Sequence, residues 1–329
     1  MDRISVIGAG SWGTVLANML ALKGHTVTLW AYEAETVQSI LSTGVNEIFM
    51  PELNLSSNVK PTNDINEAVD SVKYVIFSVP SQFLRRVLDL IKLKLPQDAV
   101  VVTAAKGIEK VTLMTASAVI RDFLPNEVAA LSGPSFAKEV ALRKPAAVSL
   151  GVQNDTNGHI LQEVLNTEYF RVYTNDDILG VELGGALKNV IAIASGICDG
   201  LSLGNNARAA LITRGLSEIV RLGVKAGARE RTFSGLSGIG DLVLTCTGVL
   251  SRNYTVGKKL GMGQSPQEIV KGMKAVAEGV ETSQSAYELS VRHGVEMPIV
   301  EQVYKVIHHG KDPGSAVKEL MSRELKREF

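Results

Sequence analysis

The chain has 329 residues, of which 45% are hydrophobic and 21% are charged, as in globular rather than disordered proteins. The 34 basic residues balance 34 acidic ones, so the net charge does not favour a nucleic-acid partner. The two cysteines, Cys198 and Cys246, are too few for a disulfide framework or a four-cysteine zinc site. We therefore expect a reduced, cytoplasmic protein with no metal site. No apolar stretch approaches the roughly 20 residues of a membrane span.

The first half of the chain alternates short apolar runs with amphipathic segments. The predicted strands are 4–7, 27–30, 74–79, 99–103, 128–131, 147–150 and 170–173. Helices are predicted between several of these runs, at 15–22 and 83–91. Strands separated by helices indicate βαβ units and a mostly parallel sheet.

Helical periodicity dominates after about residue 176. The predicted helices are 183–196, 207–222, 266–273, 282–290 and 299–308. A chain of this length is expected to form about two domains. We predict an α/β fold with a Rossmann-type, dinucleotide-binding domain at 1–178 and an all-helical substrate domain at 179–329.

A glycine turn, Gly8-Ala9-Gly10-Ser11-Trp12-Gly13, follows the first predicted strand and opens a helix. In a dinucleotide-binding turn, the first glycine permits the tight bend, the second admits a pyrophosphate, and the third lets helix pack on strand. The helix N-terminus offers free N–H groups to phosphate. A purely structural turn is the alternative. The position of the glycine turn between a strand and a helix favours binding of NAD or NADP.

The residues after the second predicted strand usually decide between these two cofactors. An acid there binds the ribose 2′-hydroxyl, whereas a base accepts a 2′-phosphate. This chain has Tyr32 and Glu33 at that point, and Glu33 follows Gly13 by 20 residues. Glu33 is either the ribose-binding acid or an ordinary acid in the first turn of a helix. No arginine stands there, so the sequence leans toward NAD without excluding NADP.

Small and polar residues follow three predicted strands, at 78–82, 103–107 and 132–137. Ligands of open α/β sheets bind beyond the C-terminal ends of the strands. Lys106 is the one charged residue in its small-residue neighbourhood. A solvated surface lysine is the default interpretation, but the strand-end position favours contact with an anion.

In the second half, Lys188 and Asn189 interrupt an apolar, small-residue helix that also contains Gly184 and Gly185. Glycine costs a helix roughly 1 kcal/mol, which suggests close approach by the cofactor or the first domain. Burial would lower the pKa of Lys188 toward the range useful for acid–base catalysis. The alternative is a lysine that extends from a buried helix to solvent.

Two further polar groups follow. Asp241 comes after a glycine turn and before an apolar helix, so it is either a site residue or a helix N-cap. Ser251 has the character of an N-cap, with Arg252 and Asn253 in the first helical turn. Because the helix dipole disfavours an arginine there, a compensating phosphate is preferred to a plain surface arginine.

The chain resembles the bacterial-type NAD(P)-dependent glycerol-3-phosphate dehydrogenases along essentially its whole length. The runs that carry the resemblance are 8–13, 132–137, 184–189, 237–247, 251–253 and 294–299. The resemblance implies reduction of dihydroxyacetone phosphate to sn-glycerol 3-phosphate, a precursor of phospholipids. It also implies a homodimer.

The resemblance further implies that Lys188 donates the proton to the carbonyl oxygen. The implied substrate site consists of Lys106, Gly133, Ser135, Lys188, Asp241, Ser251, Arg252 and Asn253. The implied dinucleotide contacts, with the glycine turn included, are Gly8, Gly10, Ser11, Trp12, Gly13, Tyr32, Lys106, Ala137, Arg252, Val276 and Glu278. Tyr32 departs from the family pattern, because members often have a basic residue or histidine there.

Two other functions are compatible with parts of the sequence. A 3-hydroxy acid dehydrogenase would share the glycine turn and the helical lysine, but its asparagine typically lies one helical turn after that lysine, whereas Asn189 is adjacent to Lys188. A non-catalytic dinucleotide sensor would need no set of lysine, aspartate and arginine. The phosphate-binding character of Arg252 favours the phosphorylated substrate.

Overall fold

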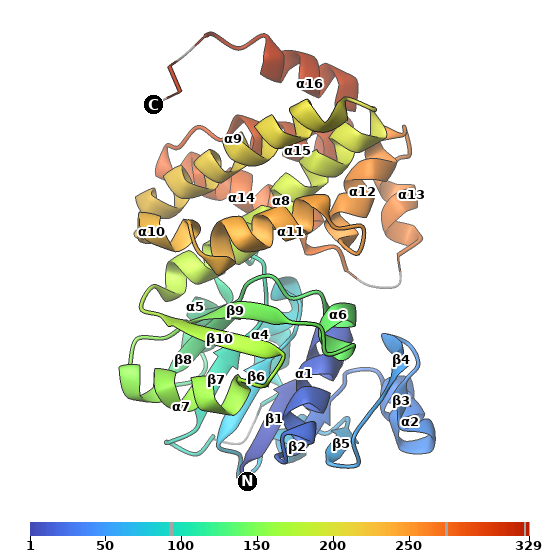
Figure 1. Cartoon of the computed structure of the whole chain (residues 1–329), viewed down its shortest axis with the longest axis vertical. Helices are drawn as coiled ribbons and strands as arrows, with labels where there is room; N and C mark the ends of the chain where they lie inside the picture. The colour runs from blue at the N-terminus through green and yellow to red at the C-terminus, as the bar shows by residue number, and fades with distance from the viewer. Residues whose placement is uncertain (92–94, 274–275, 326, 329) are drawn as a thin grey trace.

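The computed structural model describes residues 1–91, 95–273, 276–325 and 327–328, and it has two parts stacked along its long axis (Figure 1). The N-terminal part is built on a sheet whose strand order is β10-β9-β8-β7-β6-β1-β2-β5. These strands are β1 (Arg3–Ile7), β2 (Thr26–Trp30), β5 (Val59–Thr62), β6 (Tyr74–Phe77), β7 (Val100–Thr103), β8 (Val128–Ser132), β9 (Ala146–Gly151) and β10 (Phe170–Asn175).

Every pair in this sheet is parallel except β8 with β9, which confirms the predicted α/β class and the mostly parallel sheet. Its helices are α1 (Ser11–Leu22), α2 (Ala34–Thr43), α3 (Ile65–Val69), α4 (Ser81–Asp89), α5 (Ala116–Arg121), α6 (Ala137–Ala141) and α7 (Asp155–Leu165). A short hairpin of β3 (Val45–Asn46) and β4 (Met50–Asn54) lies beside it.

All seven strands expected from the sequence are present, and β3, β4 and β5 are additional. The β5 sequence, Val-Lys-Pro-Thr, has no apolar alternation, and it occupies a sheet edge, where a proline is tolerated.

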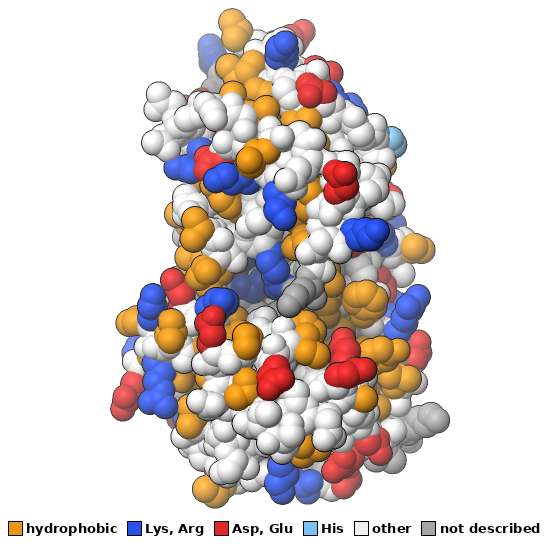
Figure 2. Space-filling model, turned by 90° about the vertical axis from the view of Figure 1, so that its right-hand side faces the viewer, with side chains coloured by type: hydrophobic (Ala, Val, Ile, Leu, Met, Phe, Trp, Pro, Cys, Tyr) orange, Lys and Arg blue, Asp and Glu red, His pale blue; other side chains and the backbone are white. Residues whose placement is uncertain are grey.

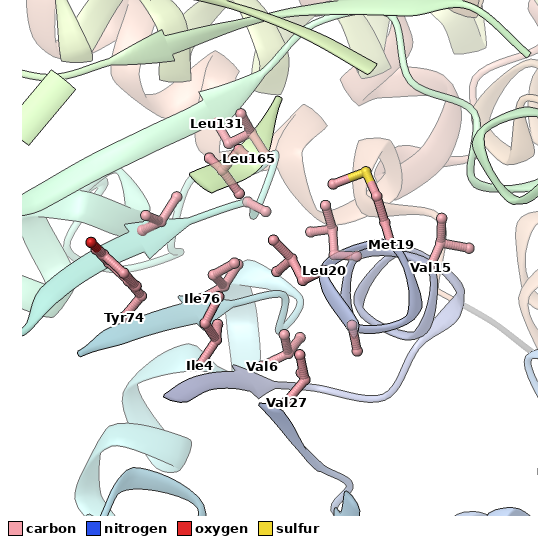
Figure 3. Close-up of a cluster of buried hydrophobic side chains, with 14 of the residues drawn as sticks. Ile4, Val6, Val15, Met19, Leu20, Val27, Tyr74, Ile76, Leu131 and Leu165 are labelled. Carbon is pink, nitrogen blue, oxygen red and sulfur yellow. The ribbon is translucent and has the colours of Figure 1, made fainter. Parts of the chain in front are cut away.

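The central strands are apolar on both faces because helices cover both. Ile4 and Val6 of β1 face the cluster beneath α1, while Ile7 faces the opposite cluster. Figure 3 shows the first cluster, in which side chains of β1, β2 and β6 meet those of α1, including Val15 and Leu20. This double burial fixes the strand ends, and with them the loops that could bind a ligand.

The C-terminal part is helical. Its elements are α8 (Ile178–Gly200), α9 (Gly204–Lys225), α10 (Glu230–Phe233), the π-helical turn η1 (Leu236–Gly240), α11 (Asp241–Thr247), α12 (Arg252–Gly261), α13 (Pro266–Lys271), α14 (Glu278–His293), α15 (Pro298–His309) and α16 (Pro313–Met321). Helix α8 is long and apolar enough to cross a membrane, yet 94% of that stretch is buried in the protein, as expected of a core helix.

Helix α8 joins the two parts. Ile178 and Val181, in its first turns, pack with Ala130 of β8. The carboxylate of Glu182 accepts hydrogen bonds from the backbone N–H of Ser117, at 2.7 Å, and from its hydroxyl, at 2.6 Å. The following turns form the centre of the helical part. The domain division at 178/179 stays a prediction, and it falls inside the first turn of α8.

Glycines let α12 lie directly against α8. A Cβ at Gly196 of α8 would be 2.1 Å from the carbonyl oxygen of Tyr254, and one at Gly257 of α12 would be 1.9 Å from that of Ile193. Backbone carbonyls cannot move aside as a flexible side chain can. The close packing against α8 therefore fixes the position of α12, and with it the position of Arg252 at the start of that helix.

We predict that Gly257→Ala destabilises the protein by about 1–3 kcal/mol, because the added methyl group forces α12 away from α8. The matched control is Gly272→Ala, whose Cβ would meet no heavy atom closer than 3.5 Å. Chemical denaturation of both variants measures the difference. Equal stability of the two would contradict the packing account.

Candidate active site

The glycine turn is shaped for a dinucleotide. Gly8 has φ +109°, a conformation that side chains rarely adopt, and its N–H donates to Trp30 O at 3.0 Å. A Cβ at Gly13 would be 1.9 Å from Gly8 O, so this glycine allows α1 to pack on β1. At Gly10 a Cβ would meet nothing within 4 Å, so the space in front of the α1 N-terminus is open.

Gly10 is the N-cap of α1, and no side chain caps the helix. Its first N–H groups are therefore available to an anion. The indole Nε1 of Trp12 is buried without a hydrogen-bond partner among the described residues. The Ser11 hydroxyl donates to Phe49 O at 2.9 Å, so the group of Ser11 that can donate to a ligand is its backbone N–H. These features fit the pyrophosphate of a nicotinamide dinucleotide.

Lys106 stands after β7 and reaches the residues that follow β8. Its Nζ donates to Gly133 O at 2.8 Å and to the Ser135 hydroxyl at 3.3 Å. The same Nζ donates to the Asp241 carboxylate at 2.9 Å. Three predicted site residues of the first part thus meet one from the second.

Lys188 approaches Asp241 from the other side. Its Nζ donates to Oδ1 of Asp241 and, at 2.8 Å, to the Thr245 hydroxyl. Asp241 is only 1% exposed, and it is the first residue of α11, behind Gly240 as N-cap. The alternative of an N-capping aspartate is wrong, because its carboxylate binds the two lysines instead.

The two ammonium groups and the single carboxylate leave a positive excess in this cluster. Burial lowers the pKa of Lys188 to about 8, although Asp241 partly raises it and Lys106 lowers it further. The two lysines hold the pKa of the Asp241 carboxyl below its ordinary value despite its burial. At neutral pH the site therefore holds a carboxylate and a protonated Lys188 whose proton is unusually acidic.

Arg252 is the first residue of α12, and its charge and that of Lys106 both act on the buried carboxyl group of Glu278. The Arg252 side chain is exposed, and its guanidinium makes no hydrogen bond or ion pair with another described residue. The hydroxyl of Ser251 accepts from Tyr254 N at 3.1 Å, so Ser251 is the N-cap of α12. In Figure 2, Lys and Arg side chains line the hollow between the two parts.

A chain of amides links the start of α12 to Lys106. Gly279 N donates to Asn253 Oδ1 at 3.0 Å, and Asn253 Nδ2 donates to Asn189 Oδ1 at 2.8 Å. Asn189 Nδ2 then donates to Lys106 O at 2.9 Å. Asn189 and Thr245 are absent from the site predicted from the sequence. An amide in an otherwise apolar helix is the one signal that marks Asn189.

Three more predicted residues stand at or just before the starts of α6 and α14. Glu278 begins α14, and its carboxylate accepts from Ser81 N at 2.8 Å, while burial raises its pKa. Ala137 begins α6, and Val276 is 40% exposed just before α14. Glu278 thereby ties α14 to the start of α4 across the two parts.

The family models for the NAD-dependent glycerol-3-phosphate dehydrogenase N-terminus and C-terminus match residues 3–158 and 177–318. The chain belongs to this family. It is 53% identical to glycerol-3-phosphate dehydrogenase [NAD(P)+] of Citrifermentans bemidjiense and 54% identical to that of Geobacter sulfurreducens, and each alignment covers 99% of both chains.

The crystal structure of a glycerol-3-phosphate dehydrogenase from Coxiella burnetii superposes with a TM-score of 0.93 at 40% identity, covering 98% of this chain and 99% of that one. D-mandelate dehydrogenase, at 15% identity and a TM-score of 0.62, shares the fold alone. Family membership makes the chain an oxidoreductase that uses a nicotinamide dinucleotide.

We predict that Gly10→Ala weakens dinucleotide binding by about tenfold or more, because the methyl group enters the open space at the α1 N-terminus. Its folding stability should change by less than about 0.5 kcal/mol. The contrasting variant, Gly13→Ala, should lose about 1–3 kcal/mol of stability. Calorimetric titration with NADH and thermal unfolding separate the two effects. Unchanged affinity in Gly10→Ala would remove the turn from the binding site.

Proposed function

We propose that this chain catalyses the reversible reduction of dihydroxyacetone phosphate to sn-glycerol 3-phosphate, with Lys188 as the general acid and base. The observation that carries the proposal is the buried Asp241 carboxylate, which binds Lys188 and Lys106 beside the exposed Arg252. The cluster supplies a proton donor, a second cation and a phosphate ligand within one cleft.

The bound dinucleotide supplies the hydride that reaches the carbonyl carbon of the substrate. The residues of the chain stabilise the charge that develops on the carbonyl oxygen, and they transfer the proton. Lys188 donates its Nζ proton to the carbonyl oxygen as that oxygen becomes negative, and in the reverse direction the neutral amine accepts the proton. The Lys106 ammonium stabilises the same negative charge. Asp241 and Thr245 orient Lys188 through the hydrogen bonds described above.

Arg252 is the proposed phosphate ligand. Its guanidinium makes no hydrogen bond or ion pair with another described residue, although it interacts with the charge of Glu278. Arg252 also stands at a helix N-terminus, where N–H groups favour an anion. Binding the phosphate away from the reacting carbon would hold the carbonyl near Lys188. Ser251 and Asn253 act by fixing the start of α12, since their side chains are bonded within the protein.

The product is a precursor of glycerophospholipids, and we propose that the enzyme supplies their synthesis. Both cysteines are free and buried, which agrees with a reducing, cytoplasmic compartment. A homodimer stays a prediction from the family resemblance.

The pH dependence of the two directions should be opposite. Reduction needs the protonated Lys188, so kcat/KM for dihydroxyacetone phosphate should fall as pH rises through about 8. Oxidation of sn-glycerol 3-phosphate needs the neutral amine, so its kcat/KM should rise through the same pH.

We predict that Lys188→Met loses about 10²–10⁴-fold in rate while it still binds NADH. A fully active Lys188→Met variant would exclude Lys188 from the mechanism.

Arg252 should matter only for phosphorylated substrates. We predict that Arg252→Ala lowers kcat/KM for dihydroxyacetone phosphate by about 10²-fold or more, and that it changes the slow turnover of unphosphorylated dihydroxyacetone less than about threefold. The control is Arg292→Ala, which removes an exposed arginine bonded to Thr112 O. Equal losses on both substrates in Arg252→Ala would contradict phosphate binding by this residue.

A further inference from the structure

The end of β2 lies directly beside the glycine turn. Residues of β1 and β2 pair in parallel as far as Ile7 and Trp30, and Gly8 N then donates to Trp30 O. On the other side, Ala31 N donates to Thr62 O at 3.0 Å. Tyr32 and Glu33 are thus the first residues free of the sheet. In a Rossmann-type domain this position faces the 2′ position of the adenosine ribose.

The segment around this position carries only negative charge. From Thr26 to Val59 there is no lysine, arginine or histidine, and the charged residues are Glu33, Glu35, Glu47 and Glu52. Lys60, the next cation along the chain, pairs with Thr28, two residues before β2 ends. It is therefore set back from the strand end by roughly 6–7 Å. The turn after β5 adds Asn63 and Asp64, and Asp64 caps α3.

Glu33 is placed to accept a hydrogen bond. It is the N-cap of α2, with extended backbone at φ −81° and ψ 122°, and its side chain makes no capping hydrogen bond. The side chain is exposed. Its carboxylate is therefore available to a neutral hydroxyl donor, whereas it would repel a phosphate dianion. Glu35, in the first turn of α2, adds a second negative charge.

Tyr32 occupies the position where a basic side chain would meet a 2′-phosphate. Tyr32 as a whole is 74% exposed, and its ring lies edge-on to that of Trp30, with 6.3 Å between the ring centroids. A phenol offers one weak hydrogen bond and no positive charge. Neither residue at the strand end therefore compensates the two negative charges of a 2′-phosphate.

We propose that this chain selects NADH over NADPH, with Glu33 as the residue that accepts the ribose 2′-hydroxyl and excludes the 2′-phosphate. The proposal rests on the proposed function, and it assigns the cofactor that the relatives' name, glycerol-3-phosphate dehydrogenase [NAD(P)+], leaves open.

Calorimetric titration of the free enzyme with NADH and with NADPH tests this selectivity without turnover. Wild type should bind NADH at least about tenfold more tightly. Glu33→Gln removes the negative charge but keeps an acceptor oxygen, so NADPH should gain at least about fivefold while NADH changes less than about threefold. Tyr32→Arg should also strengthen NADPH binding, because guanidinium pairs with phosphate.

The control is Asp98→Arg, a larger charge change at an exposed residue just before β7, at the N-terminal end of a strand that runs parallel to β1 and β2. It should leave the ratio of the two affinities unchanged. Equal or tighter binding of NADPH by wild type would overturn the selectivity but not the reaction. An unchanged ratio in Glu33→Gln would overturn the assignment to Glu33. Binding of neither dinucleotide would overturn both this proposal and the proposed function.

Discussion

A single buried carboxylate holds the site together. Asp241 accepts hydrogen bonds from Lys106, which follows a strand of the sheet, and from Lys188, on the central helix of the second part. Without it, the Lys188 ammonium would be an unpaired buried charge, which costs several kcal/mol. The same contact joins the two parts of the molecule at the proposed substrate site.

The packing around α8 brings the residues of this contact together. The glycines of α8 permit close neighbours on both sides: a Cβ at Gly185 would be 2.3 Å from the Ser132 hydroxyl, and one at Gly184 would be 2.5 Å from Ser237 O. The first contact is with the sheet domain, and the second is with the π-helical turn that leads into Asp241. The amides of Asn189 and Asn253 then connect Lys106 to the start of α12. Lys188, the proposed proton donor, and Arg252, the proposed phosphate ligand, are therefore connected through one hydrogen-bonded network.

Much of this arrangement follows from sequence because it depends on local patterns. Apolar runs gave the strands, glycine spacing gave the dinucleotide turn, and Lys188 is conspicuous in an apolar helix. Asp241 remained ambiguous, because a carboxylate after a glycine turn has the same local pattern as an N-cap. The sequence marks Asn189 as polar in an apolar helix but assigns it no place in the site, and it does not mark Thr245 at all. Their roles arise only when α8, α11 and the loop after β7 come together, which no local spacing encodes.

The central claim is that Asp241 and burial together set the proton affinity of Lys188. An NMR titration of the Lys188 side chain, with isotope-labelled lysine assigned by comparison with Lys188→Met, measures this directly. We expect a pKa of about 8 for Lys188 in wild type, well below the ordinary 10.5. In Asp241→Asn it should be lower still, because the carboxylate that favours the ammonium is gone. An ordinary lysine pKa in wild type, or no change in Asp241→Asn, would contradict the account.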